Sequence, residues 1–134
     1  MSITMGHCGV HEEFRRDLFP VPSSVQLGRD LAEVHLNKWG LAVLADDVTL
    51  IVSELLTNAL TAGQGMITLS LSLRPGVLTI EVADVGSGVP RRRKARKDDV
   101  NGRGLQIVEH LAESWGHRSA PDGGKVVWAR CLLS

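Results

Sequence analysis

Two short runs near the middle of the chain alternate strictly between apolar and polar residues. The apolar positions are Ile67, Leu69, Leu71 and Leu73 in the first run, and Leu78, Ile80 and Val82 in the second. Alternating residues point to opposite faces of a β-strand, so each of these strands buries one face only. Arg74-Pro75-Gly76 lies between the runs and suits a tight turn. The sequence therefore predicts an antiparallel hairpin that other elements must cover on one face.

The segment before this hairpin predicts two helices that can supply the cover. The first begins at Ser23, whose hydroxyl we expect to cap the first turn, with Gln26 at the spacing of a capping box. Gly40 is its expected stop. The apolar stripe predicted to be buried consists of Leu27, Leu31 and Val34.

The second predicted helix carries a longer apolar face. It begins near Asp46 or Asp47, either of which can cap it, and it ends at Gly63. Its apolar residues recur at spacings of three and four: Val48, Ile51, Val52, Leu55, Leu56 and Ala59. This period places all of them on one side of a helix.

The remaining elements complete a small sheet and a third helix. Residues 13–19 predict an edge strand that ends before Pro20, and short strands near 117–119 and 125–133 flank a turn at 121–124. The third helix is expected to stop at Gly116, with one face made of Leu105, Val108, Leu111, Ala112 and Trp115. These elements predict an α+β fold, a two-layer α/β sandwich whose mixed, mostly antiparallel sheet has helices on one face.

Length and charge limit the classes of function. The chain has 134 residues, with 15 basic and 15 acidic side chains and no net charge. We expect one domain, residues 13–134, after a flexible N-terminus of residues 1–12. The charge balance gives no general attraction to nucleic acid or to a membrane. Because Cys8 and Cys131 are the only cysteines and no spanning segment or secretion signal is present, we expect a cytoplasmic protein.

Glu54 and Asn58 form the first cluster with chemical potential. They are four residues apart on the second predicted helix, so both lie on the same side, at the rim of its apolar face. A carboxylate can act there as a general base, and an amide oxygen is a hard ligand that suits Mg²⁺. The alternative is two polar residues on a solvated helix edge.

The second cluster, Asp84-Val85-Gly86-Ser87-Gly88, follows directly after a strand. The carboxylate of Asp84 can accept a hydrogen bond from an exocyclic amine such as that of adenine. Gly86 and Gly88 let the backbone turn and approach a flat ring closely. A plain turn at the end of a strand is the alternative.

The third cluster, Asn101-Gly102-Arg103-Gly104-Leu105, leads into the third predicted helix. Backbone N–H groups at such a helix start can bind phosphate, and a glycine-rich hinge is the alternative. We interpret residues 89–101 before it as a long mobile loop that could close over a nucleotide. Within that loop, the basic run 91–97 could contact phosphates of ATP, an acidic partner or nucleic acid, or it could simply be solvated. It has no interleaved aromatic residues, which disfavours a groove for single-stranded nucleic acid.

In this order the clusters resemble the boxes of the gyrase, chaperone, histidine-kinase and mismatch-repair (GHKL) ATPase superfamily. Within it, the chain resembles the small anti-sigma-factor serine kinases and their single-domain actinobacterial relatives. The resemblance covers residues 13–133 and rests on these stretches: Ser53 to Ala59, Asp84-x-Gly86-x-Gly88, Gly102 to Leu105, Trp115-Gly116, Trp39-Gly40-Leu41 and Gly123 to Ala129.

The resemblance implies the Bergerat ATP-binding fold, with ATP and Mg²⁺ as ligands and a histidine kinase-like ATP-binding domain over residues 13–134. Asn58 would hold Mg²⁺, Glu54 would activate the attacking hydroxyl, and Asp84 would recognise adenine. The remaining ATP-binding residues would be Gly86, Gly88, Gly102, Arg103, Gly104 and Leu105.

Two positions depart from the family pattern. Ala62 stands where the family often has His, and Val126 where it often has Thr, which would remove a hydrogen bond near the adenine.

The resemblance implies an anti-sigma-type serine/threonine protein kinase whose partners are a sigma factor, an antagonist (anti-anti-sigma) protein or both. A non-catalytic, ATP-responsive binding module is the alternative. We expect no membrane partner and no nucleic acid as a partner. The sequence leaves open whether the chain forms a homodimer.

Overall fold

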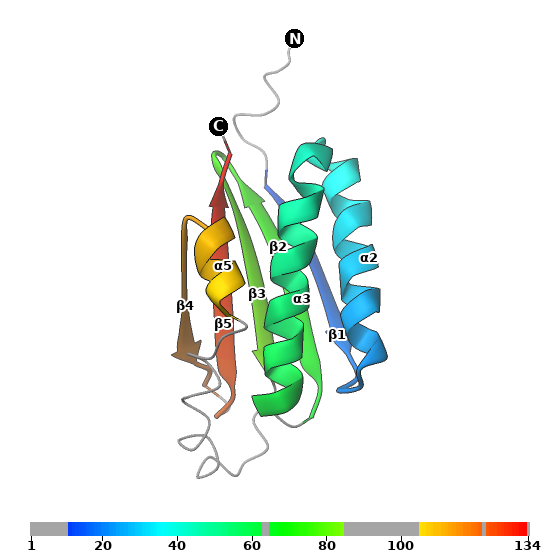
Figure 1. Cartoon of the computed structure of the whole chain (residues 1–134), viewed down its shortest axis with the longest axis vertical. Helices are drawn as coiled ribbons and strands as arrows, with labels where there is room; N and C mark the ends of the chain where they lie inside the picture. Colours follow the sequence, from blue (N-terminus) through cyan, green and yellow to red (C-terminus); the bar gives the residue numbers. More distant parts are fainter. Residues whose placement is uncertain (1–10, 63–64, 85–104, 122, 134) are drawn as a thin grey trace.

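The computed structural model describes residues 11–62, 65–84, 105–121 and 123–133. Its elements are, in chain order, β1 (Glu12–Leu18), α2 (Ser23–Lys38), the short 3-10 helix η1 (Ala42–Leu44), α3 (Ala45–Ala62), β2 (Ile67–Arg74), β3 (Val77–Asp84), α5 (Leu105–Leu111), β4 (Ser114–Ser119) and β5 (Lys125–Leu132). Figure 1 shows α2, α3 and α5 side by side on one face of the sheet. The predicted α+β sandwich is confirmed.

The five strands lie in the order β1-β2-β3-β5-β4, with β1 at one edge as predicted. Each of the four pairings that the structure describes is antiparallel, so the sheet shows none of the parallel pairing that a mixed sheet implies. The predicted hairpin is β2–β3, and its register runs from Ile67 opposite Asp84 to Arg74 opposite Val77. Pro75 and Gly76 form the turn, and Gly76 has a φ of 81°, which glycine adopts without strain.

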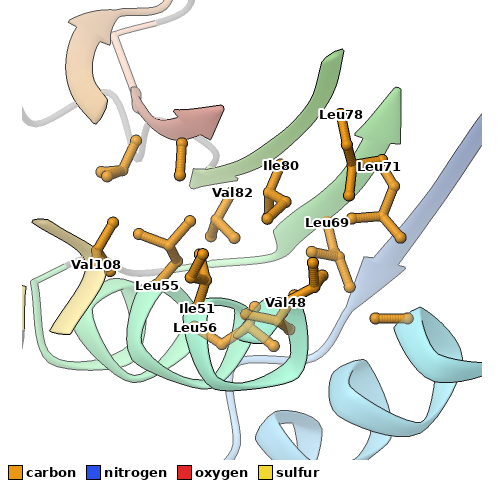
Figure 2. Packing of buried hydrophobic residues seen from close by; sticks show 14 of the residues in the cluster. Val48, Ile51, Leu55, Leu56, Leu69, Leu71, Leu78, Ile80, Val82 and Val108 are labelled. Carbon is orange, nitrogen blue, oxygen red and sulfur yellow. The ribbon is translucent and has the colours of Figure 1, made fainter. Parts of the chain in front are cut away.

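The core lies between α3 and this hairpin. Every predicted apolar residue of α3 is buried, and so is every inward residue of the two strands. Figure 2 shows Ile51 and Leu55 of α3 directed toward Ile80 and Val82 of β3. Val108 of α5 joins the same cluster. The hydrophobic patterns of the hairpin and of α3 therefore predict the main packing contact correctly.

The predicted buried stripe of α2 is wrong. Leu27 is 40% exposed and Val34 is 52% exposed. The buried positions are instead Ser24, Gly28, Ala32 and Leu36. Gly28 lies so close to α3 that a Cβ atom added to it would collide with Cδ1 of Leu56. Small residues allow this close helix–helix approach, and a search for large apolar residues overlooks them.

The ends of α2 differ in how well they are predicted. Pro22 is the N-cap residue, and no side chain caps the helix, so the capping box expected at Ser23 is absent. The hydroxyl of the next residue, Ser24, donates a hydrogen bond to the carbonyl of Phe19 at 2.7 Å. The predicted stop at Gly40 is confirmed. Gly40 has a φ of 76°, and the N–H of Leu41 donates to the carbonyl of Leu36, as in a Schellman motif.

Two other helix boundaries also differ from the expectation. α3 begins at Ala45, so Asp46 and Asp47 lie in its first turn, where they interact favourably with the helix dipole without acting as caps. α5 ends at Leu111, and Trp115 and Gly116 belong to β4. A Cβ atom on Gly116 would lie 2.8 Å from Cζ2 of Trp128, so this glycine serves strand packing and does not stop a helix.

No helix in the described ranges is long and apolar enough to cross a membrane.

Replacement of Gly28 by Ala tests the close packing of α2 on α3. Alanine raises helix propensity by about 1 kcal/mol, but overpacking a core costs about 1–3 kcal/mol. We expect Gly28→Ala to lower the free energy of unfolding in urea by about 1 kcal/mol, and the exposed Asn37→Ala on the same helix to change it by less than about 0.5 kcal/mol. A Gly28→Ala protein more stable than the native chain would contradict this packing.

The buried thiol of Cys131 generates a pH prediction. Burial, and to a smaller extent the charge of Asp47, raises the pKa of Cys131 from about 9.0 to about 11. Between these pH values the unfolded chain loses the thiol proton while the folded chain retains it. The associated stability is therefore complete below about pH 9 and is lost as the pH rises to about 11.

Urea unfolding of the native protein and of Cys131→Ala across this pH range measures the effect. We expect the native chain to lose more stability than the variant as the pH rises, because both retain every other titrating group. Parallel loss in the two proteins would show that the thiol ionises equally in the folded and unfolded states.

Candidate nucleotide site

Asp84 is the last residue of β3 and lies at the end of the core. It is 4% exposed, and among the described residues it is the one charged side chain that is buried. Its neighbours across the sheet are Ile67 on β2 and Lys125 on β5. The main-chain N–H of Lys125 donates to Oδ1 of Asp84 at 3.1 Å. Because side chains alternate along β3, Asp84 points to the same face as Val82, toward the helices.

Glu54 and Asn58 lie on the flank of α3 that faces away from α2. Leu56 contacts Gly28 of α2. Asn58 comes two residues later, and a rotation of about 100° per residue places it on nearly the opposite side of the helix. Figure 1 shows α5 on that side. Both side chains are half-buried, and the amide oxygen of Asn58 is enclosed by protein. The expected place at the rim of the apolar face is thus observed.

The connection between α3 and the hairpin brings these residues to one end of the molecule. α3 ends at Ala62 and β2 begins at Ile67, which lies opposite Asp84. The C-terminal turns of α3, which carry Asn58, are therefore near the strand end that carries Asp84, as Figure 1 also shows. Leu105 begins α5 beside α3 and is buried in the shared core. Any contact between Leu105 and ATP would thus involve its backbone.

The other predicted site residues lie outside the described part of the chain: Gly86, Gly88, Gly102, Arg103 and Gly104. The same holds for Gly63, for the loop 89–101 with its basic run, and for the N-terminal residues 1–10. Their roles stay predictions. The start of α5 at Leu105 agrees with the expectation that a helix follows the third cluster directly.

The side chains at this end of the fold suit a cation that is held partly by the protein and partly by phosphate. Within the described ranges, no group of three or more His, Cys, Asp or Glu side chains could hold a metal alone. The amide oxygen of Asn58 is a hard ligand, and Mg²⁺ is usually bound through one or two such groups together with substrate phosphates. The residues present therefore fit Mg²⁺ that arrives with a nucleotide.

The register of β5 changes the interpretation of Val126. Val126 lies opposite Ala83, whereas Lys125 lies opposite Asp84. Since neighbours across a sheet share a face, Val126 points away from the helices and away from the carboxylate of Asp84. Its neighbours Val127 and Ala129 belong to the helix-side core, and Val126 does not. The hydrogen bond near adenine that this position was expected to lose is therefore not supported by the strand geometry.

Lys125 is the residue that the sequence patterns missed. It meets Asp84 through a pairing of strands 41 residues apart in the chain. Its position in the Gly-Gly-Lys stretch marks the start of a strand, but nothing local indicates which residue it faces. Only the register between β3 and β5 shows this contact.

A family model described as a histidine kinase-like ATPase domain matches residues 21–131, from before α2 to within β5. The chain belongs to this family. The resemblance to the superfamily is thus confirmed, and the matched range contains Glu54, Asn58 and Asp84.

Among characterised proteins, the chain is similar to an anti-sigma F factor from Bacillus licheniformis. The two are 26% identical over 94 residues, a match that covers 60% of this chain and 64% of the relative. The chain thus spans less than two thirds of that relative's length. This similarity agrees with the anti-sigma type of histidine kinase-like ATPase domain.

Proposed function

We propose that this histidine kinase-like ATPase domain is an ATP-binding regulatory protein that acts as an anti-sigma-type serine/threonine kinase. The observation that carries the proposal is the buried carboxylate of Asp84 at the same end of the fold as Asn58. Burying a carboxylate is costly, so such a group at the rim of a core is a candidate binding residue.

Asp84 supplies recognition of the base in this proposal. A carboxylate only accepts hydrogen bonds, so it selects a ligand that offers an amine, as adenine does at N6. Val82 lies two residues before Asp84 on the same face of β3 and belongs with Ala59 to the apolar core, which would border a flat ring bound at Asp84. Gly86 and Gly88 would shape the rest of the base pocket.

Asn58 and Glu54 supply the chemistry at the phosphates. The amide oxygen of Asn58 would hold Mg²⁺, which would supply positive charge to neutralise the phosphates. Gly102, Arg103 and Gly104 would cover the phosphates at the start of α5. Glu54 is one helical turn from Asn58, about 5–6 Å between Cβ atoms, so it would serve as a base near a phosphate held at Asn58.

The proposed reaction is transfer of the γ-phosphoryl group to a serine hydroxyl on an antagonist protein. The hydroxyl oxygen forms a bond to the γ-phosphorus while the bond to the bridging oxygen of ADP breaks. The hydroxyl proton passes to the carboxylate of Glu54. Catalysis then depends mainly on positioning and on charge stabilisation.

The partners proposed are a sigma factor, bound in one nucleotide state, and the antagonist protein that is phosphorylated. The similarity to a protein named anti-sigma F factor supports this choice. The second candidate is a non-catalytic module that binds its partner in response to ATP. This candidate is motivated by Ala62, which stands where the family often has His. Val126 gives it no support, because its side chain lies on the face of the sheet away from Asp84.

Asn58→Ala tests the magnesium-dependent part of ATP binding. Loss of a group at a metal site weakens metal binding by roughly 10–100-fold. We expect Asn58→Ala to weaken ATP binding by about tenfold or more in the presence of Mg²⁺, and much less when Mg²⁺ is chelated. Isothermal titration calorimetry measures both, and the exposed neighbour Thr57→Ala is the control. Equal losses with and without Mg²⁺ would show that Asn58 has no role toward the ion.

Glu54→Gln separates the two candidate functions. The substitution retains the size of the side chain but removes the base, so we expect phosphoryl transfer to fall by roughly 10²–10⁴-fold. ATP affinity should stay within about twofold, because the base acts only in the reaction. Transfer is measured with labelled ATP, Mg²⁺ and a cognate antagonist protein. ATP binding by the native chain without any transfer would favour the non-catalytic module.

A further inference from the structure

The apolar stripe of α2, which consists of Leu27, Leu31 and Val34, lies outside the core. Leu27 is 40% exposed and Val34 is 52% exposed, and Leu31 between them is half-buried without belonging to the core cluster. Spacings of four and three residues place all three on one side of the helix. Contiguous apolar side chains on a surface mark candidate contacts with another chain.

The stripe lies beside the free edge of the sheet. β1 is an edge strand, and among the described residues no strand pairs with its outer side. The ring of His35, one turn after Leu31 on α2, contacts the ring of Phe14 on β1, with centroids 4.0 Å apart. Figure 1 shows α2 and β1 at the same side of the molecule, with no labelled helix or strand beyond them. A strand added to β1 would therefore pack against the stripe.

The side chains of β1 limit which strand can be added. Charges on an edge strand oppose pairing with unrelated strands, and all but two residues of β1 are charged. Their signs are ordered, since Glu12 and Glu13 come before Phe14 and two arginines follow it. Within the described part of the chain, these arginines, Arg15 and Arg16, form no ion pair. Opposite charges on directly opposed residues stabilise a strand pair, and like charges destabilise it.

We propose that the edge of β1 beside the apolar stripe of α2 binds an extended segment of a partner protein by strand addition. The segment runs antiparallel to β1, bonds its main chain to the free edge and directs alternate side chains toward α2. It has acidic residues opposite Arg15 and Arg16 and basic residues opposite Glu12 and Glu13. The inference goes beyond the proposed function and does not depend on ATP binding.

A strand accounts for both the free edge and the stripe. A helix packed on the stripe would leave the main chain of β1 unpaired. A second copy of the chain that paired its β1 here would bring its own α2 to the same edge. Neighbouring strands are about 4.8 Å apart, whereas packed helices need about 8–10 Å between their axes, so the two α2 helices would collide. The geometry therefore favours a segment that carries no covering helix of its own.

A synthetic peptide with the sequence Val-Lys-Glu-Glu-Val-Lys-Lys, blocked at both ends, is the probe. Antiparallel pairing places its second valine opposite Phe14. We expect calorimetry on the full chain to show saturable binding with a Kd below about 1 mM, and hydrogen exchange of the β1 amides to slow down. The control peptide carries N-methyl groups on its second glutamate and second valine, because one of two neighbouring N–H groups must face β1. It should bind about tenfold more weakly or worse.

Val34→Asp and Asn37→Asp form a matched pair on α2. Both side chains are exposed and both substitutions add one negative charge, but only Val34 belongs to the stripe. We expect Val34→Asp to weaken peptide binding by about tenfold, and Asn37→Asp to leave it within about twofold. Circular dichroism verifies that each variant is folded.

Arg16→Glu tests the direction and register of the added strand. Arg16 is opposite the first glutamate of the peptide in the proposed pairing. We expect Arg16→Glu to weaken binding by about fivefold, and a peptide with lysine in place of that glutamate to restore it. A loss that the second peptide does not restore would contradict the proposed pairing.

Absence of saturable binding at about 1 mM peptide would overturn the inference. Unchanged exchange of the β1 amides in the presence of bound peptide would do so too, because it would indicate docking on α2 alone. Binding that requires removal of residues 1–10 would assign the edge to the chain's own N-terminal segment. A native dimer that Val34→Asp dissociates would assign it to a second copy. None of these outcomes depends on whether the chain binds ATP.

Discussion

The packing of α3 on the β2–β3 hairpin is the contact on which the rest of the structure depends. Its residues include Ile51, Leu55 and Ile80, all fully buried. This single apolar interface sets the rotation of α3 about its own axis. With Ile51 and Leu55 directed to the sheet, Asn58 must lie at the edge of the interface, because it is offset from the apolar stripe by a fraction of a turn. Hydrophobic burial thus determines where the polar residues of the site are placed.

The same interface explains which parts of the fold could be predicted from the sequence. A strand that buries one face and a helix that buries one face both carry a strong periodic signal, and the hairpin and α3 have it. α2 does not, since its buried side includes Ser24 and Gly28, and its larger apolar residues are partly exposed. The strand β4 was predicted too short because Trp115 also fits a helical period, and only its pairing with Ala129 assigns it to the sheet.

The site was predictable to the extent that it is local in the sequence. Glu54 and Asn58 are related by helical spacing, and Asp84 is marked by its position at the end of an alternating strand. The contact of Asp84 with Lys125 depends on the register between β3 and β5, whose paired ends are 41 residues apart. No local pattern determines such a register, and a slip of one residue would have placed Val126 beside Asp84 on the helix side. This register, which the sequence does not reveal, places Val126 on the face away from Asp84.

The burial of Asp84 connects stability with function. A carboxylate enclosed at the end of a core is more costly than an apolar residue of similar size, even with a hydrogen bond from the backbone. A fold selected for stability alone would place an apolar residue there, as at Val82 two positions earlier on the same face. The bond from the N–H of Lys125 lowers this cost. In the proposed function, this desolvated carboxylate would need little rearrangement when a purine binds, because folding has already removed it from water.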